Sequence, residues 1–375
     1  MRTDMRRSAA PPRLDDLDRR LGHALQLDGR AAFSRIAEVL GVSDQTVARR
    51  WAKLRATGSM RVLGLTEPDV LGETVWLVRV STTPDAAVPL AEALARRADT
   101  SWVGLMAGGT EVSVVARSGS GRSRDGGEAL LLRELPRTPR VLAVTAYCRL
   151  HQFFGGAEGL ILKSGMLSPE QVAALSPPAP RPPAEPVRLT AEDERLLAVL
   201  AQDGRTPVPE LVAATGWSAS TVRRRVAELR ASGVLYFDVE YATHVFDNGL
   251  RAAVLLSVPP AKLHATGQAL AAHPQVAFAC ATTGPANLFL TVVVKDSEAL
   301  YAYLTGPVAE LPDVQHVESY PLVRTLNSRA PAPCRPDRCA ARGCPAGVVA
   351  GEPSARWRKV SARWRQGRSR RSRRG

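Results

Sequence analysis

The segments GVSDQTVARRWAKLRATG, at 41–58, and GWSASTVRRRVAELRASG, at 216–233, place one helical pattern twice in a single chain. Their offset is constant, since 216 − 41 and 233 − 58 both equal 175. In each segment, three apolar residues fall at i, i+4 and i+7, which is one face of an α-helix. Ser43 and Ser218 are placed to N-cap the two helices, and Gly58 and Gly233 suit left-handed C-terminal caps.

A shorter helix precedes each of these, over about 34–40 and about 209–215, across a tight turn that contains glycine. Two helices joined in this way predict a helix-turn-helix. A further helix begins near Asp15 in the first copy and near Thr190 in the second, where TAED is a capping pattern. Each copy is therefore expected to open with three helices.

The positions left off the apolar face of the repeated helix are polar or basic. Short polar groups stand at its N-terminal end and arginines stand behind them, which suits a helix inserted into the major groove of DNA. A solvated basic face is the alternative for one isolated helix, but the preceding helix, the cap and the repetition favour double-stranded DNA as the partner. The candidate DNA-binding residues are Ser43, Asp44, Gln45, Thr46, Arg49, Arg50, Ser218, Ser220, Thr221, Arg223, Arg224 and Arg225.

The repeat continues on both sides of this helix. Residues 14–30 align with residues 189–205 at the same offset of 175. Valine-rich segments that predict strands follow at 75–81, 111–116, 141–147, 252–258, 287–294 and 314–323. Helical segments lie between them at 86–97, 261–273 and 296–311. The order strand, helix, strand, strand, helix, strand predicts a split βαβ sandwich in each copy.

We therefore predict an α+β protein with two copies of a winged helix-turn-helix plus a ferredoxin-like (βαββαβ) domain. Residues 176–187 hold six prolines and favour an extended linker, which would reach roughly 37 Å at ~3.1 Å per residue. The predicted boundaries are a disordered N-terminus at 1–13, helix-turn-helix domains at 14–62 and 189–237, ferredoxin-like domains at 63–160 and 238–328, a Pro-rich linker at 161–188 and a basic disordered tail at 329–375.

The charge of the chain is concentrated in its tail. The formal net charge is +14, but thirteen Lys/Arg and two Asp/Glu from Ala330 onward give +11, which leaves 14 − 11 = +3 for the rest. The N-terminal MRTDMRRSAAPPR has no apolar segment of the secretory kind, and stretches such as AAVLLSV are too short to span a bilayer. We therefore expect a cytoplasmic protein with no membrane partner.

The tail also holds three of the five cysteines, Cys334, Cys339 and Cys344, at a C-x4-C-x4-C spacing. This spacing lacks a fourth ligand and the usual two-residue gap of a zinc site, so no metal site and no cofactor are predicted. Residues 356–375 carry ten Lys/Arg. Such a tail either adds nonspecific affinity for nucleic acid or is simply solvated and disordered.

Each unit resembles the Lrp/AsnC (feast/famine) family of transcriptional regulators. The opening "LD..D..il..L..dgR" of the family is matched in 14–30 and 189–205, and its "G.S...v..R...L...G" in 41–58 and 216–233, with Arg50 and Arg225 at the matched arginine. The resemblance implies an N-terminal winged helix-turn-helix and a ferredoxin-like domain that self-associates and binds an amino-acid effector. Family members usually have one such unit per chain, so the duplication is unusual.

The resemblance also implies an effector site at a glycine-containing turn, which is usually followed by an acidic residue. That turn is Gly108, Gly109 and Glu111 in the first copy, and Gly284 with Asn287 in the carboxylate position in the second. Two alternatives keep the fold. One is an enzyme resembling the sirohaem decarboxylases, which needs histidines and arginines around a cavity, whereas the six histidines form no motif by spacing. The other is a tandem scaffold without DNA. We expect a regulator and not an enzyme.

The two repeated helices differ where they face outward. Asp44, Gln45 and Ala48 stand where Ala219, Ser220 and Arg223 stand in the second copy. Because base-edge contacts carry sequence information, two different helices are expected to read two different half-sites. The linker reach of roughly 37 Å is comparable with the ~34–36 Å between half-sites one DNA turn apart. The duplication therefore predicts a covalent pseudo-dimer for an asymmetric operator.

Overall fold

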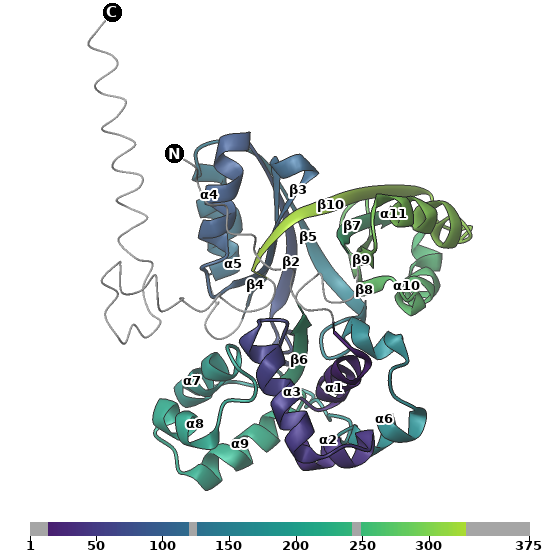
Figure 1. Ribbon diagram of the computed structural model, residues 1–375. Helices are drawn as coiled ribbons and strands as arrows, with labels where there is room; N and C mark the ends of the chain where they lie inside the picture. The colour runs from purple at the N-terminus through teal and green to yellow at the C-terminus, as the bar shows by residue number, and fades with distance from the viewer. Residues whose placement is uncertain (1–13, 120–125, 242–248, 328–375) are drawn as a thin grey trace, which may run out of the picture. The chain divides into compact units, whose positions relative to one another are not determined.

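A computed structural model describes residues 14–119, 126–241 and 249–327 (Figure 1). The N-terminal segment 1–13 and the basic tail, both predicted to be disordered, lie outside the described residues. The described residues belong to one compact unit. No helix within these ranges combines the length and the apolar character needed to cross a membrane.

Each copy opens with the three predicted helices. They are α1 (Asp16–Leu27), α2 (Phe33–Leu40) and α3 (Asp44–Ala56), and α7 (Ala191–Leu200), α8 (Val208–Thr215) and α9 (Ala219–Ala231). Asp15 and Thr190 N-cap the first helix of each copy through capping boxes, as the sequence predicted. Gly58 and Gly233 have φ of 67° and 75°, so both end their helices in the left-handed region, which glycine enters without a Cβ penalty.

Each copy then continues as a βαββαβ half. The first half is β2 (Thr74–Thr82), α4 (Pro84–Leu94), β3 (Thr100–Met106), β4 (Glu111–Ser118), α5 (Gly126–Ala129) and β5 (Val141–Phe154). The second half is β7 (Leu250–Ser257), α10 (Leu263–Ala272), β8 (Val276–Thr282), β9 (Leu288–Val294), α11 (Ser297–Tyr303) and β10 (His316–Asn327). The ferredoxin-like prediction is confirmed, and strands β3 and β8, which no valine-rich segment marked, complete it.

The two halves close into one barrel. β5 of the first half pairs with β8 of the second, and β10 of the second pairs with β3 of the first. The strand order is β10-β3-β4-β2-β5-β8-β9-β7, with β10 also paired to β7. Figure 1 shows β10 running from the second half across to β3. The last strand of each half therefore pairs with a strand of its own half and with a strand of the other half. Such reciprocal pairing is expected of a symmetric dimer.

The strands after the two recognition helices, β1 (Met60–Thr66) and β6 (Leu235–Tyr241), pair with each other antiparallel. At the centre of the ladder Leu63 lies opposite Asp238, and 238 − 63 = 175, so this residue faces its own counterpart in the other copy. The sequence allowed a short wing or a strand at this point. The observed strand forms its ladder across the copies, and this pairing places a pseudo-twofold axis between the two helix-turn-helix motifs.

A pair of arginines repeats the same symmetry. Arg30 donates to the carbonyls of Gly204 (2.7 Å) and Thr206 (3.2 Å), while Arg205 donates to those of Gly29 (2.8 Å) and Ala31 (3.1 Å). Burial and the neighbouring positive charge of Arg30 lower the pKa of Arg205 to about 10. The two motifs also share one apolar core, which holds residues from both sets of three helices and from β1 and β6. They are therefore two halves of one body.

The predicted linker is partly folded. Residues 161–188 include helix α6 (Pro169–Leu175), whose Leu175 is buried and whose Gln171 donates to the carbonyl of Val39 at 2.8 Å. The proline-rich part has no helix or strand, but backbone bonds from Arg181 to Ala231 and from Val187 to Val70 fix it at two points. The pairing of β1 with β6 therefore sets the distance between the two helix-turn-helix motifs. The length that the linker could reach if extended does not set it.

Candidate nucleic-acid interface and central cavity

The recognition helices α3 and α9 present their N-terminal ends to solvent. Ser43 accepts from the amide of Thr46 (3.1 Å) and Ser218 from that of Thr221 (3.2 Å), so both predicted caps form. The three apolar residues of each helix, Val47, Trp51 and Leu54, and Val222, Val226 and Leu229, are buried. Among the candidate DNA-binding residues, the exposed ones are Ser43, Asp44, Gln45, Arg49, Ser218, Ser220, Arg223 and Arg224, while Thr46 and Thr221 are half-buried beside the caps.

The matched arginines differ from the prediction that they face phosphates. Arg225 binds Asp193 of α7 through Nε (2.7 Å) and Nη2 (2.8 Å), and the Asp193 side chain is 0% exposed. Arg50 binds Asp15, the N-cap of α1, and Asp18, the counterpart of Asp193, both through Nη1. Both guanidiniums therefore contact the start of the first helix. There they pair with the carboxylate at the third position of its capping box. These arginines position the recognition helix, a role that sequence spacing alone does not reveal.

This ion pair changes the pKa values on both of its sides. Burial would raise the pKa of Asp193, but hydrogen bonds from Arg225 and from the Thr190 amide outweigh it and hold that pKa below its usual value. The pKa of Arg225 is raised, chiefly by its hydrogen bond to Asp193. The pair is therefore fully charged at neutral pH.

The residues predicted for an effector site are placed differently in the two copies. Glu111 accepts from Arg79 Nη2 at 2.8 Å, so it is held in an ion pair. Asn287 accepts from the Val258 amide (3.0 Å) and donates to the Val258 carbonyl (2.8 Å). Both polar atoms of its side chain therefore bind the backbone of one residue. Gly108 and Gly109 have φ of 68° and 93° with open space where a Cβ would lie, and Gly284 lies against Tyr147. None of these five residues lines the central cavity described next.

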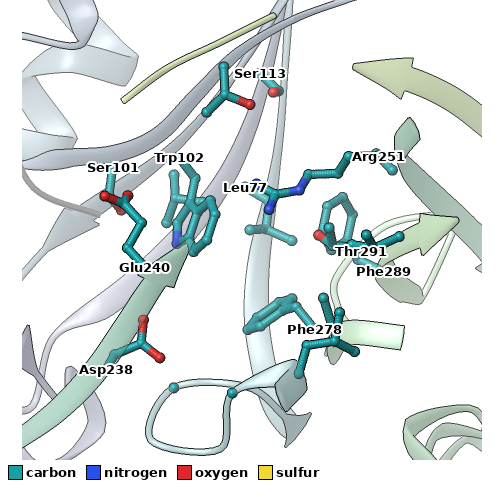
Figure 2. Close-up of a pocket in the computed structure, with 18 of the residues that line it drawn as sticks. Leu77, Ser101, Trp102, Ser113, Asp238, Glu240, Arg251, Phe278, Phe289 and Thr291 are labelled. Carbon is teal, nitrogen blue, oxygen red and sulfur yellow. The ribbon is translucent and has the colours of Figure 1, made fainter. Parts of the chain in front are cut away.

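A cavity of about 650 Å³ lies among the barrel strands and the paired strands β1 and β6. Figure 2 shows Trp102 from β3 and Arg251 from β7 extending toward the same space, with Phe278 from β8 nearby. Asp238 and Glu240 reach it from β6. A ligand in this cavity would touch both ferredoxin-like halves and the strands that join the two helix-turn-helix motifs.

Arginines give the cavity its charge. Those that line it are Arg61, Arg79, Arg117, Arg149 and Arg251. The sequence offered a signal for the last four. Arg79 lies inside the predicted strand 75–81, and Arg117, Arg149 and Arg251 lie within two residues of the ends of the predicted strands 111–116, 141–147 and 252–258. Side chains alternate across a strand, so such arginines lie on the face opposite the helix-covered core. That face is the interior of the barrel.

The lining carboxylates already have partners. Glu240 pairs with Arg61, and Asp238 accepts from Gln26 Nε2 at 3.1 Å. Glu67 lies 3.8 Å from Arg149, and burial raises the pKa of Glu67. Lys163, a further cation on the lining, donates to three backbone carbonyls. The five arginines and Lys163 outnumber the carboxylates on the lining, but Arg79, Arg117 and Arg149 also pair with Glu111, Glu73 and Asp69 just outside it.

None of the five described histidines takes part in this lining. His151 and His264 stack near one another (5.6 Å between rings), His273 contacts Tyr303, and His316 lies 3.4 Å from Glu318. His23 is buried in α1, and His244 lies outside the described residues. Among the described residues, no three His, Cys, Asp or Glu side chains are grouped as metal ligands, and the tail cysteines are outside that range.

The chain was compared with known protein families and structures. The model of the AsnC-type helix-turn-helix domain matches residues 14–55 and 189–230, and that of the Lrp/AsnC ligand binding domain matches residues 251–331. An HTH-type transcriptional regulator of Pyrococcus furiosus is 35% identical over 101 residues, which are 26% of this chain and 68% of that protein. The HTH-type transcriptional regulator FL11 of Pyrococcus horikoshii is 25% identical over 150 residues, 40% of this chain and 99% of that protein.

A solved structure is similar over most of the chain. The siroheme decarboxylase NirDL superposes with a TM-score of 0.59 over 84% of this chain and 93% of that one, at 13% identity. At this identity the similarity shows a shared fold alone. The duplicated helix-turn-helix matches, the ligand-binding match and the regulator relatives agree with the geometry. The chain belongs to the Lrp/AsnC family of helix-turn-helix transcriptional regulators.

Proposed function

We propose that this chain is a sequence-specific DNA-binding transcriptional regulator in which one polypeptide acts as a pseudo-dimer on one operator. The observation that carries the proposal is the reciprocal joining of the two motifs. Leu63 pairs with its counterpart Asp238, and Arg30 and Arg205 exchange equivalent bonds. One chain thereby holds two recognition helices in a fixed relation, which single-unit relatives would obtain by pairing two chains.

The DNA-contacting set follows from exposure. At equivalent positions, Asp44 and Gln45 of α3 are replaced by Ala219 and Ser220 of α9. These residues stand at the helix N-termini, where side chains reach base edges. Arg49 and Arg224, with Arg223 on α9 alone, provide phosphate contacts. Arg50 and Arg225 hold the helices in place. Two different sets of base contacts favour an operator with unlike half-sites.

The proposal includes a small effector, an amino acid or a related molecule, because the second half matches a ligand-binding family model. It also includes self-association of whole chains. The barrel is closed, so that contact would use outer surfaces, where Leu132, Leu142 and Leu150 are exposed by 61–68%. Sedimentation of the full chain tests this part: a monomer at micromolar concentration contradicts it.

Selection of bound fragments from a random DNA pool, followed by gel shift, tests the proposed function. The expected result is a preferred sequence with two contacted segments, both contacted by the recognition helices of the same chain, whether or not that chain is associated with another. Binding that shows no sequence preference once the tail after Asn327 is removed would favour a tandem scaffold. Contact of the two segments by two different chains would contradict the pseudo-dimer.

A second candidate is an enzyme that resembles the sirohaem decarboxylases. It is favoured by the shared tandem fold and by the arginines around the cavity. The residues expected for that chemistry include histidines, and none of the five described histidines lines the cavity. The relatives by sequence are regulators. We therefore propose that the chain is not an enzyme, and a Soret band on the purified protein would favour the second candidate.

A further inference from the structure

The two halves of the barrel can be aligned residue by residue. Val78 pairs with Val114 in the first half and Val254 pairs with Leu290 in the second, so the offset is 254 − 78 = 290 − 114 = 176. On this offset Trp102 corresponds to Phe278. Both residues line the cavity, and each lies at a register shift between its strand and the next. The cavity therefore has an aromatic side chain at the same place on each side of its pseudo-symmetry.

The charged positions do not follow this symmetry. Arg79 and Arg117 of the first half correspond to Leu255 and Val293 of the second, and all four line the cavity. The basic residue of the second half, Arg251, corresponds to a valine, Val75, which lines the cavity as well. A ligand on an exact twofold axis would meet identical walls. These walls differ in charge, so they suit one ligand in one orientation.

Arg251 and Trp102 form a joint surface within the cavity. The guanidinium carbon of Arg251 lies 5.5 Å from the centre of the Trp102 ring, and Figure 2 shows both side chains reaching the same space. Trp102 has a φ of 52°, a left-handed conformation that is strained for a bulky residue. This strain is tolerated at a bulge that directs the indole into the cavity. Strained residues of this kind concentrate at ligand sites.

We propose that this cavity binds one planar aromatic anion, with its rings against Trp102 and Phe278 and its carboxylate or sulfonate at Arg251. A volume of about 650 Å³ is that of a small-molecule site, and such sites combine apolar and aromatic side chains with charged groups that fix the orientation of the ligand. Arginine binds a carboxylate through two parallel hydrogen bonds, which fixes the orientation of the ligand. Flat rings gain further from aromatic contacts and from the cation above the indole.

The same ligand would influence the helix-turn-helix motifs. The cavity is also lined by Arg61 of β1 and by Asp238 and Glu240 of β6, the strands that join the two motifs. A ligand that touches these strands shifts the relation of the recognition helices if it binds one arrangement better than another. This regulatory consequence rests on the proposed function, whereas binding of the anion does not.

The test uses two dyes that differ by one sulfonate group, 8-anilinonaphthalene-1-sulfonate and the uncharged N-phenyl-1-naphthylamine, added to the full chain without DNA. We expect the sulfonate to saturate at one per chain with enhanced emission. Arg251→Gln should weaken its binding by about tenfold or more, since a hydrogen bond to a charged group contributes ~1.5–3 kcal/mol. The uncharged dye should be unaffected by that change. Phe278→Leu should weaken both dyes.

Arg324→Gln is the matched control, because Arg324 is an exposed strand arginine that does not line the cavity. Equal sulfonate affinity in Arg251→Gln and Arg324→Gln, with both variants showing wild-type thermal unfolding, overturns the proposal. So does binding of several sulfonates per chain, none of them sensitive to Arg251. Operator affinity is measured separately: a chain that binds the dye as expected but no DNA contradicts the proposed function and leaves this site standing.

Discussion

Replacing Arg225 with alanine separates a helix-positioning role from a phosphate-binding role. The change removes two hydrogen bonds of 2.7 and 2.8 Å to the Asp193 carboxylate, whose side chain is 0% exposed, while Arg225 itself is 27% exposed. Leaving a buried carboxylate without its cation costs ~3–5 kcal/mol when water is excluded. Partial exposure of the arginine reduces this, and we expect a loss of ~2–3 kcal/mol in the free energy of unfolding.

Arg50→Ala provides a comparison within the same chain. Arg50 binds the half-exposed Asp15 and reaches the buried Asp18 through one contact of 3.1 Å, so its loss should cost less than that of Arg225, ~1–2 kcal/mol. Urea unfolding of both variants measures the difference. A double-mutant cycle of Arg225→Ala with Asp193→Asn should show coupling of ~1–2 kcal/mol, since the two residues share one interaction.

DNA affinity measured against salt then decides the role of Arg225. A phosphate contact contributes to counterion release, so its loss lowers the salt slope by about one. Arg223→Ala, which removes an exposed arginine of the same helix, should lower the slope in this way. Arg225→Ala should weaken binding with the slope unchanged. Unaltered unfolding together with a reduced slope in Arg225→Ala would refute the positioning role.

Three further predictions follow from the same contacts. The pKa values of Asp15 and Asp193 are held low by their arginines despite burial, so these pairs stabilise the fold above the usual carboxyl pKa. That contribution should be lost as the pH falls below ~4, more steeply in the wild type than in Arg225→Ala, as acid unfolding followed by circular dichroism will show. Gly267→Ala would place a Cβ 2.3 Å from the Phe153 ring, so we expect ~1–3 kcal/mol of destabilisation in urea and would reject this packing if stability rose. Truncation after Asn327 should weaken binding to all DNA fragments by a similar factor and flatten the salt slope; a changed sequence preference would contradict it.

Much of the fold could be predicted because local signals repeat at a fixed offset. Ser43 and Ser218 cap the helices, and the valine-rich strands fall close to their predicted places. Strand β8, VAFACAT, was not predicted, because alanine has a low propensity for strands and the segment holds few β-branched residues. The pairing of β1 with β6 and the exchange of β5 and β10 join residues more than a hundred positions apart, which local periodicity does not specify.

The candidate site was predictable only in part for the same reason. Outward positions such as Gln45 and Ser220 follow from helix geometry, whereas the ion pairs of Arg50 and Arg225 depend on where the first helix packs. The sequence did not predict the cavity, because its lining residues come from both halves and meet only when the barrel closes. An arginine within a valine-rich strand, such as Arg79, is the signal that sequence analysis can use in other tandem chains of this kind.

The central claim is that one chain reads two unlike half-sites with two unlike helices. The most direct measurement is base preference along the selected operator for the wild type, Gln45→Ala and Ser220→Ala, determined by footprinting on systematically altered fragments. We predict that each substitution relaxes base preference in one half of the operator and leaves the other half unchanged, because base-edge contacts carry the specificity. A symmetric operator whose two halves respond equally to either substitution would contradict the account.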